Sequence, residues 1–94
     1  MTTLNKTDMV AHIAEIADLS KAAAKRALDA LLEGITDALC AGDQVTFVGF
    51  GTFKTADRKA REGRNPLTGA KIQIAAKRVP VFKAGKQLKD EVDS

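Results

Sequence analysis

Residues 55–78 have the sequence TADRKAREGRNPLTGAKIQIAAKR, and this stretch decides the fold because it offers so little apolar surface. Residues 55–63 are almost all charged or small. Ile72 and Ile74 alternate with polar residues as in a strand, but residues 55–63 give them no apolar partners. Residues 64–69, between the two segments, are dense in turn formers. The stretch predicts a long two-stranded arm that projects from a body and is only marginally ordered alone.

The segments on either side of the arm complete a predicted antiparallel sheet. Residues 44–47 and 50 to about 56 alternate like strands and are joined at Val48–Gly49. Residues 79–82 return from the arm, and residues 86–92 can form a short helix. We expect an α+β fold in which a three-stranded sheet extends into the β-ribbon arm and is followed by this helix.

A first helix is predicted near the N-terminus. Asn5 is a suitable N-cap, and Asp8 lies three residues on, where a carboxylate suits the helix dipole. Met9, Ile13 and Ile16 recur with the spacing of one buried helix face.

A second helix is predicted from residue 21 to about residue 41, capped by Ser20 and ended by Gly42. Its apolar positions cover well over 100° of its surface, which is too wide for one stripe. Because 94 residues can build only a thin core, we expect a partner chain to cover this helix. The alternative is that it packs on both the first helix and the sheet of its own chain. The expected dimer core consists of Leu28, Leu32, Ile35, Leu39, Phe50, Phe53 and Phe82.

Three of the four phenylalanines lie within residues 47–53. Exposed aromatic rings could stack on the bases of a single strand. The chain has no Trp or Tyr, however, so the phenylalanines are the only large rings that can fill a thin core. We therefore interpret them as core residues.

Length and composition indicate one small folded domain, residues 1–94, with its body at about 1–54 and 79–94 and its arm at 55–78. The single cysteine, Cys40, cannot form an intramolecular disulfide, which favours a reducing compartment. The N-terminal residues do not have the pattern of a signal peptide, and no apolar run reaches the length of a membrane span. We expect a cytoplasmic protein with no membrane partner.

The charges are strongly segregated along the chain. Residues 1–53 hold four cations and seven anions, whereas residues 54–89 hold eleven cations and two anions. The net charge of +3 conceals this contrast. A basic segment beside an acidic one predicts a polyanionic partner, with nucleic acid as the leading candidate.

The side chains needed for enzymatic or metal chemistry are scarce. Cys40 is interpreted as a small buried thiol, and His12 as a solvated or paired imidazole near Asp8 and Glu15. One His and one Cys fall short of a four-ligand metal site. Gly49–Phe50–Gly51 lacks the third glycine and the following helix of a dinucleotide site. We predict no catalytic residue, no metal, no cofactor and no small-molecule substrate.

The tip of the arm, Arg64–Asn65–Pro66, has a chemistry of its own. Proline has an apolar ring and a fixed φ, so it can enter between base pairs as a rigid wedge. Arg64 and Asn65 are residue types that reach minor-groove acceptors. A plain surface turn is the alternative, but the flanks of the arm favour DNA because they carry Arg58, Lys59, Arg61, Lys71, Lys77 and Arg78.

Three separated motifs resemble the bacterial histone-like HU family, in order and at the expected distances. They are residues 49–53 (GFGTF), 60–69 (AREGRNPLTG) and 82–89 (FKAGKQLK). The helical opening is similar too, and the resemblance covers residues 4 to about 92. It implies an intertwined homodimer or heterodimer with a paralogue, whose helices form a base and whose two arms embrace double-stranded DNA.

By this resemblance, Pro66 is the intercalating wedge, with Arg64 and Asn65 in the minor groove. Arg58, Arg61 and Lys77 would line the arm, and Lys6, Lys83, Lys86 and Lys89 would meet phosphates from the body. The chain departs from the family at Leu67, where a polar residue usually follows the proline. Leu67 could deepen the wedge or pack the tip.

The function implied is that of a nucleoid-associated protein that bends and condenses DNA with little sequence specificity. A preference for bent, nicked or gapped DNA is expected with it. One alternative is a sequence-preferring DNA bender like integration host factor, a sister group with the same fold. Another is an assembly module whose basic arm binds acidic proteins.

Overall fold

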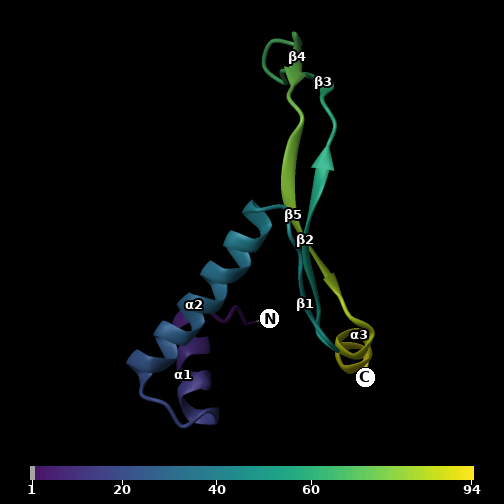
Figure 1. Cartoon of the computed structure of the whole chain (residues 1–94). Coiled ribbons are helices and arrows are strands. Elements are labelled where there is room, and N and C mark those ends of the chain that lie inside the picture. The colour runs from purple at the N-terminus through teal and green to yellow at the C-terminus, as the bar shows by residue number, and fades with distance from the viewer. Residues whose placement is uncertain (1) are drawn as a thin grey trace. The chain divides into compact units, whose positions relative to one another are not determined.

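The computed structural model describes residues 2–94, which form an α+β fold as predicted. The elements follow one another along the chain as shown in Figure 1: α1 (Lys6–Ile16), α2 (Lys21–Cys40), β1 (Val45–Phe47), β2 (Gly51–Arg58), β3 (Arg61–Arg64), β4 (Lys71–Ile74), β5 (Lys77–Ala84) and α3 (Lys86–Asp93). The chain divides into two compact units, one up to residue 37 and one from residue 38 onward.

The predicted caps of both N-terminal helices are confirmed. The side chain of Asn5 accepts a hydrogen bond from the backbone N–H of Asp8 at 2.9 Å. The Asp8 carboxylate accepts one in return from the backbone N–H of Asn5 at 3.0 Å. This reciprocal pair is a capping box, and it satisfies two amides that the helix leaves without partners. Ser20 caps α2 by accepting a hydrogen bond from the N–H of Ala23 at 3.1 Å.

The end of α2 also follows from its sequence. The helix ends at Cys40, one residue earlier than predicted. Gly42 has a φ of +82°, the left-handed conformation that glycine adopts without strain. This lets the Asp43 N–H reach the Ala38 carbonyl at 2.9 Å and the Gly42 N–H reach the Leu39 carbonyl at 3.1 Å. The pattern is a Schellman motif, and it ends α2 at Cys40.

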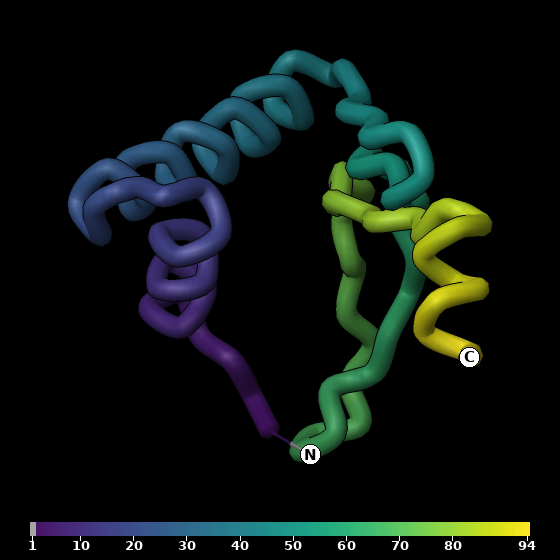
Figure 2. The backbone as a smooth tube through the Cα atoms, turned by 90° about the horizontal axis from the view of Figure 1, so that it is seen from below, coloured from purple at the N-terminus to yellow at the C-terminus, as the bar shows by residue number. Residues whose placement is uncertain are grey.

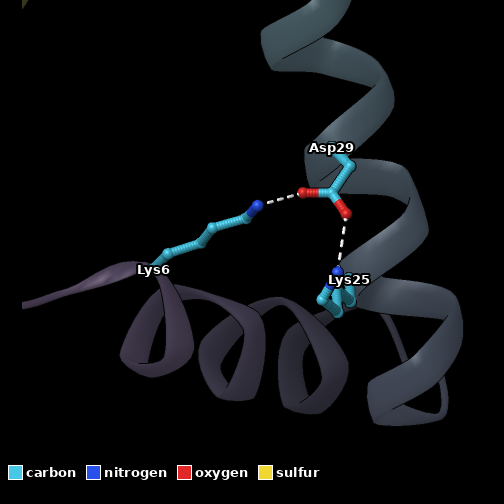
Figure 3. Close-up of polar contacts among 3 residues, drawn as sticks. All are labelled: Lys6, Lys25 and Asp29. Carbon is cyan, nitrogen blue, oxygen red and sulfur yellow. Dashed lines mark hydrogen bonds and ion pairs between the residues drawn. The ribbon is translucent and has the colours of Figure 1, made fainter.

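An ion-paired group joins α1 to α2 in the first unit. The Asp29 carboxylate on α2 binds the ammonium groups of Lys6 on α1 and Lys25 one turn earlier on α2, the latter at 2.9 Å (Figure 3). The hydrogen bond from Lys6 and then that from Lys25 hold the pKa of Asp29 below its usual value of 3.8. Lys6 is thus engaged within the chain.

The second unit contains the predicted three-stranded antiparallel sheet, in the order β1-β2-β5. The tight turn between β1 and β2 is closed by a hydrogen bond from the Phe50 N–H to the Phe47 carbonyl at 2.9 Å. Gly49 takes a φ of +82° at the third position of this turn, as a type II turn requires. β2 pairs with β5 from Gly51↔Ala84 to Arg58↔Lys77.

The arm continues this ladder as β3 paired with β4, at the end of the ribbon far from α3 (Figures 1 and 2). The strand predicted to be continuous from Thr55 to Gly63 is interrupted at residues 59–60, opposite residues 75–76. Two residues separate the paired segments on each strand, so the register is unchanged. Ala60 lies opposite Ala75 there, and such small side chains supply almost no cross-strand contact to hold the ladder closed.

The apolar core within one chain is very small. Among residues 2–94, the buried hydrophobic side chains are those of Val10 and Ala24. The inward face of α1 therefore runs through Val10, with Ile13 and Ala14 half-buried beside it. The predicted face is right at Ile13 and wrong at Met9 and Ile16, which are 41% and 73% exposed.

The phenylalanines cluster with one another but remain partly open. The ring centroids of Phe53 and Phe82 lie 4.7 Å apart, and those of Phe50 and Phe82 lie 5.6 Å apart. Phe50 and Phe82 are nevertheless 47% and 42% exposed. On α2, Leu31 and Leu32 are 47% and 45% exposed. The chain by itself leaves its apolar surface unfinished, which is the pattern that a partner chain would complete.

The prediction that Cys40 is a buried thiol is wrong for the chain alone, because Cys40 is exposed. Ala38 and Leu39 are half-buried. Cys40 lies one residue further round the helix, on a side that the chain leaves open. An apolar neighbourhood in sequence did not indicate which side of α2 is covered.

We expect stability to depend on protein concentration, because a partner chain would have to cover the exposed side chains of α2. The melting temperature should rise with concentration, and Leu32→Asp should unfold the assembly because a buried, unpaired charge is costly. Calorimetry and sedimentation over a range of concentrations measure both effects. A monomer at micromolar concentration with a melting temperature independent of concentration would contradict this expectation.

The pairing of Asp29 predicts a pH dependence of the first unit. A carboxyl whose pKa is lowered in the folded state stabilises that state above the unfolded pKa. This stabilisation is lost as the pH falls through the lower, folded value. A carbon NMR titration of Asp29 should give a midpoint below 3.8. The double variant Lys6→Met, Lys25→Met should return the midpoint towards that value, and a parent midpoint at or above 3.8 would refute the pairing.

Candidate nucleic-acid interface

Strand register gathers the basic side chains of the arm onto one face. Side chains alternate between the faces of a ribbon, and directly paired residues share a face. Arg58 pairs with Lys77, and Arg64 pairs with Lys71. Arg58 and Arg64 are six positions apart, as are Lys71 and Lys77, so all four share a face. This surface, called here the cationic face, carries one acidic side chain, Glu62, and six basic ones: Lys54, Arg58, Arg64, Lys71, Lys77 and Lys83.

The cationic face contains two pairs of like charges directly across the ribbon, Arg58 with Lys77 and Arg64 with Lys71. Such pairs destabilise an isolated ribbon. In the part of the chain that the structure describes, the ion pairs are Lys6–Asp29, Lys25–Asp29 and Lys86–Asp90. None of these neutralises the arm. An anion lying along this face would relieve the repulsion.

The interruption of the ribbon forms a second anion-compatible feature. Arg58, Lys59, Arg61 and Lys77 surround an open hollow of about 480 Å³, together with Ile74 and Ala75. Basic residues from both strands thus border the stretch between the two paired segments. The positive charge of this lining suits an anion such as a phosphate group. The structure thereby brings together four of the side chains that the sequence assigned to DNA.

Arg78 has a different environment. It lies on the face opposite to that of Lys77, and its guanidinium donates a hydrogen bond to the Cys40 carbonyl at 3.0 Å. Basic side chains stabilise helix C-termini in this way, because the last carbonyls have no partners within the helix. Sequence reasoning grouped Arg78 with the DNA contacts and missed this bond. Only strand alternation beside Lys77 could have indicated that Arg78 faces the other way.

The tip is a turn closed by several hydrogen bonds. The Asn65 N–H donates to the Ala70 carbonyl at 2.9 Å, and the Gly69 N–H donates to the Asn65 carbonyl at 2.7 Å. The side-chain oxygen of Asn65 accepts from the Leu67 N–H at 2.8 Å. Asn65 therefore braces the tip, and its NH₂ group is the part that can reach groove acceptors. Pro66 is exposed beside it.

The body cations are placed in two groups. Lys83, Lys86 and Lys89 line one hollow, where β5 passes into α3. Lys86 also pairs with Asp90 at 3.1 Å, but both side chains are so exposed that the pair is weak. Lys6 belongs to the first unit, where Asp29 binds it.

The described residues contain no cluster of three or more His, Cys, Asp or Glu side chains that could hold a metal ion. Within the same residues, none of the helices combines the length and the apolar character that a membrane crossing needs.

Comparison with known proteins gives one family. Residues 4–93 match the family model described as bacterial DNA-binding protein. The chain is 65% identical to the DNA-binding protein HU-alpha of Vibrio proteolyticus over 89 residues, which are 95% of this chain and 99% of that protein. It is 57% identical to HU-beta of Serratia marcescens over 96% of this chain and all of that protein. The Anabaena HU–DNA cocrystal structure superposes with a TM-score of 0.91 at 49% identity, covering 95% and 97% of the two chains.

Arg61 and Arg78 form a matched pair for testing the interface, because both lie on the same face of the arm. Within residues 2–94, the Arg78 side chain has a hydrogen bond and the Arg61 side chain has none. Arg61→Ala should weaken duplex binding and flatten the plot of log affinity against log salt by about one unit for each phosphate that the variant no longer neutralises. Arg78→Ala should instead lower stability by about 1 kcal/mol, since it removes a charged hydrogen bond. Salt titrations and melting curves separate the two effects. An unchanged salt slope in Arg61→Ala would contradict the assignment.

Proposed function

The chain belongs to the bacterial DNA-binding protein family, and from this premise we propose that it is a nucleoid-associated architectural protein that binds and bends double-stranded DNA. The observation that carries the proposal is the cationic face, whose opposed like charges end at an exposed proline. A related chain of the same fold, at 49% identity, has been crystallised with DNA. The family is one of DNA-binding proteins and is not known as a family of enzymes.

The arm supplies affinity through the phosphates. Arg58, Lys59, Arg61, Lys71 and Lys77 can each neutralise a backbone charge, which releases counterions and favours binding regardless of sequence. If a dimer contacts about 6–10 phosphates, affinity should fall about 10³–10⁵-fold between 50 and 200 mM salt. Lys83, Lys86 and Lys89 extend the contact onto the body, and Lys6 joins them once it leaves Asp29.

The tip supplies the bend. Pro66 enters a base step from the minor groove, while Arg64 and the NH₂ group of Asn65 donate to acceptors at the groove floor. Unstacking the step costs a few kcal/mol, which the additional phosphate contacts of a bent duplex offset. Because phosphate contacts dominate this interface, we propose low sequence specificity.

Two chains are needed for this action. One arm can contact one side of a kink, whereas two arms can hold the duplex from both sides. We propose that a second copy or a paralogue covers α2 and the phenylalanine cluster, so that the two units of each chain belong to a single DNA-binding domain. Cys40 would then lie near that partner. We place the dimer in the cytoplasm on the nucleoid.

Replacing Pro66 should separate bending from binding. Pro66→Ala retains every charge of the arm but removes the rigid ring, so weak, salt-dependent binding to straight duplex should be nearly unchanged. Most of the bend should be lost, as measured by end-to-end energy transfer on a short labelled duplex. The preference for nicked over intact DNA should shrink too, because the nick already removes part of the stacking cost.

The comparison variant is Arg61→Ala, which should lower affinity for every duplex because it removes a backbone charge and leaves the wedge intact. If Pro66→Ala bends DNA as strongly as the parent protein, the tip is only a turn.

A further inference from the structure

We propose that Leu67 is a second wedge residue, which enters the opened base step beside Pro66 and makes the protein select steps that unstack easily. This inference rests on the proposed function and adds a residue that determines specificity. It would make the wedge a pair of apolar side chains, Pro66 and Leu67, rather than one ring.

The first support is the position of Leu67. Its side chain is 93% exposed, so it does not pack the tip. It lies in the turn between β3 and β4, at the end of the ribbon far from α3 (Figure 1). Single exposed leucines are ordinary on protein surfaces. This one, however, follows Pro66 directly and stands where the cationic face ends, at the pair Arg64↔Lys71.

The second support is that the backbone of the tip is braced. The Leu67 N–H is bound by the Asn65 side chain at 2.8 Å. The Gly69 N–H is bound by the Asn65 carbonyl at 2.7 Å, and the Ala70 N–H by the Thr68 hydroxyl at 3.2 Å. These bonds order the backbone at and after Leu67, whose side chain is exposed, before any ligand arrives. Less ordering is then required on binding, which favours affinity.

The third support is the chemistry of an opened base step. Unstacked bases expose flat apolar faces, and the side chains that natural minor-groove benders insert between them are apolar, leucine included. Burying a leucine side chain there is expected to raise affinity about tenfold or more. A wider wedge also opens the step further. Pyrimidine–purine steps deform most easily, so a deeper wedge increases the preference for them.

The experiment uses the full chain and three tip sequences. Leu67→Gln keeps the length of the side chain and the N–H that binds Asn65, but makes the side chain polar. Leu67→Met keeps the apolar character and is the matched control. Affinity and energy-transfer bend are measured at one salt concentration on nicked duplex, and on intact duplexes with a central TA step or a central A-tract. A salt series and a melting curve are recorded for each chain.

We expect Leu67→Gln to bind nicked duplex about tenfold more weakly, to bend DNA less and to lose part of its preference for the TA step. Leu67→Met should match the parent. The slope of affinity against salt should be unchanged in both variants, because no charge is altered. Melting temperatures should also be unchanged, because Leu67 is exposed.

Two results would overturn the inference. Leu67→Gln could bind, bend and discriminate like the parent, or Leu67→Met could lose as much as Leu67→Gln, in which case apolar character is not what matters. Failure of the proposed function looks different, because the parent protein itself would then not bind or bend any of the duplexes.

Discussion

The register of the β ribbon is the constraint on which the arm depends. β2 pairs with β5 up to Arg58↔Lys77, and the same register resumes at Arg61↔Ile74 after two unpaired residues on each strand. A shift by one residue would move every side chain to the opposite face. The preserved register therefore keeps the basic side chains of the sheet and of the tip on one face, with Glu62 between them. Two of the cross-strand pairs on this face place like charges opposite each other.

The two halves of the sequence also differ in how their charges are paired. In the first unit, the basic side chains of Lys6 and Lys25 share one ion-pair partner, Asp29. The second unit has no comparable acidic partner for the arm, where Asp57 and Glu62 stand among many cations. Two carboxylates cannot balance the cations of the arm, so most of the compensating negative charge would have to come from outside the chain. An anionic ligand such as DNA would then stabilise the ribbon that binds it.

Much of this architecture could be predicted from sequence, because local rules determine it. The caps at Asn5 and Ser20, the left-handed Gly42 and the turn at Val48–Gly49 each follow from the chemistry of a few neighbouring residues. The features that sequence did not reveal depend on residues far apart in the chain. The exposure of Cys40 depends on what covers α2, and the bond of Arg78 joins β5 to the end of that helix. The interruption at residues 59–60 depends on which side chains stand opposite.

The candidate site also has features that could be predicted from sequence and features that could not. That the arm is basic, and that Pro66 stands at its tip, could be predicted from the order of the residues. The sequence did not show which cations share a face, because this depends on how the two strands of the arm pair. Asn65 illustrates the difference most clearly, since sequence assigned it to the groove, whereas its side-chain oxygen binds the Leu67 N–H. The side chain that was expected to bind DNA therefore also fixes the geometry of its two apolar neighbours. A brace of this kind orders the turn without a ligand, which is what the proposed wedge would need to unstack a base step without first being ordered itself.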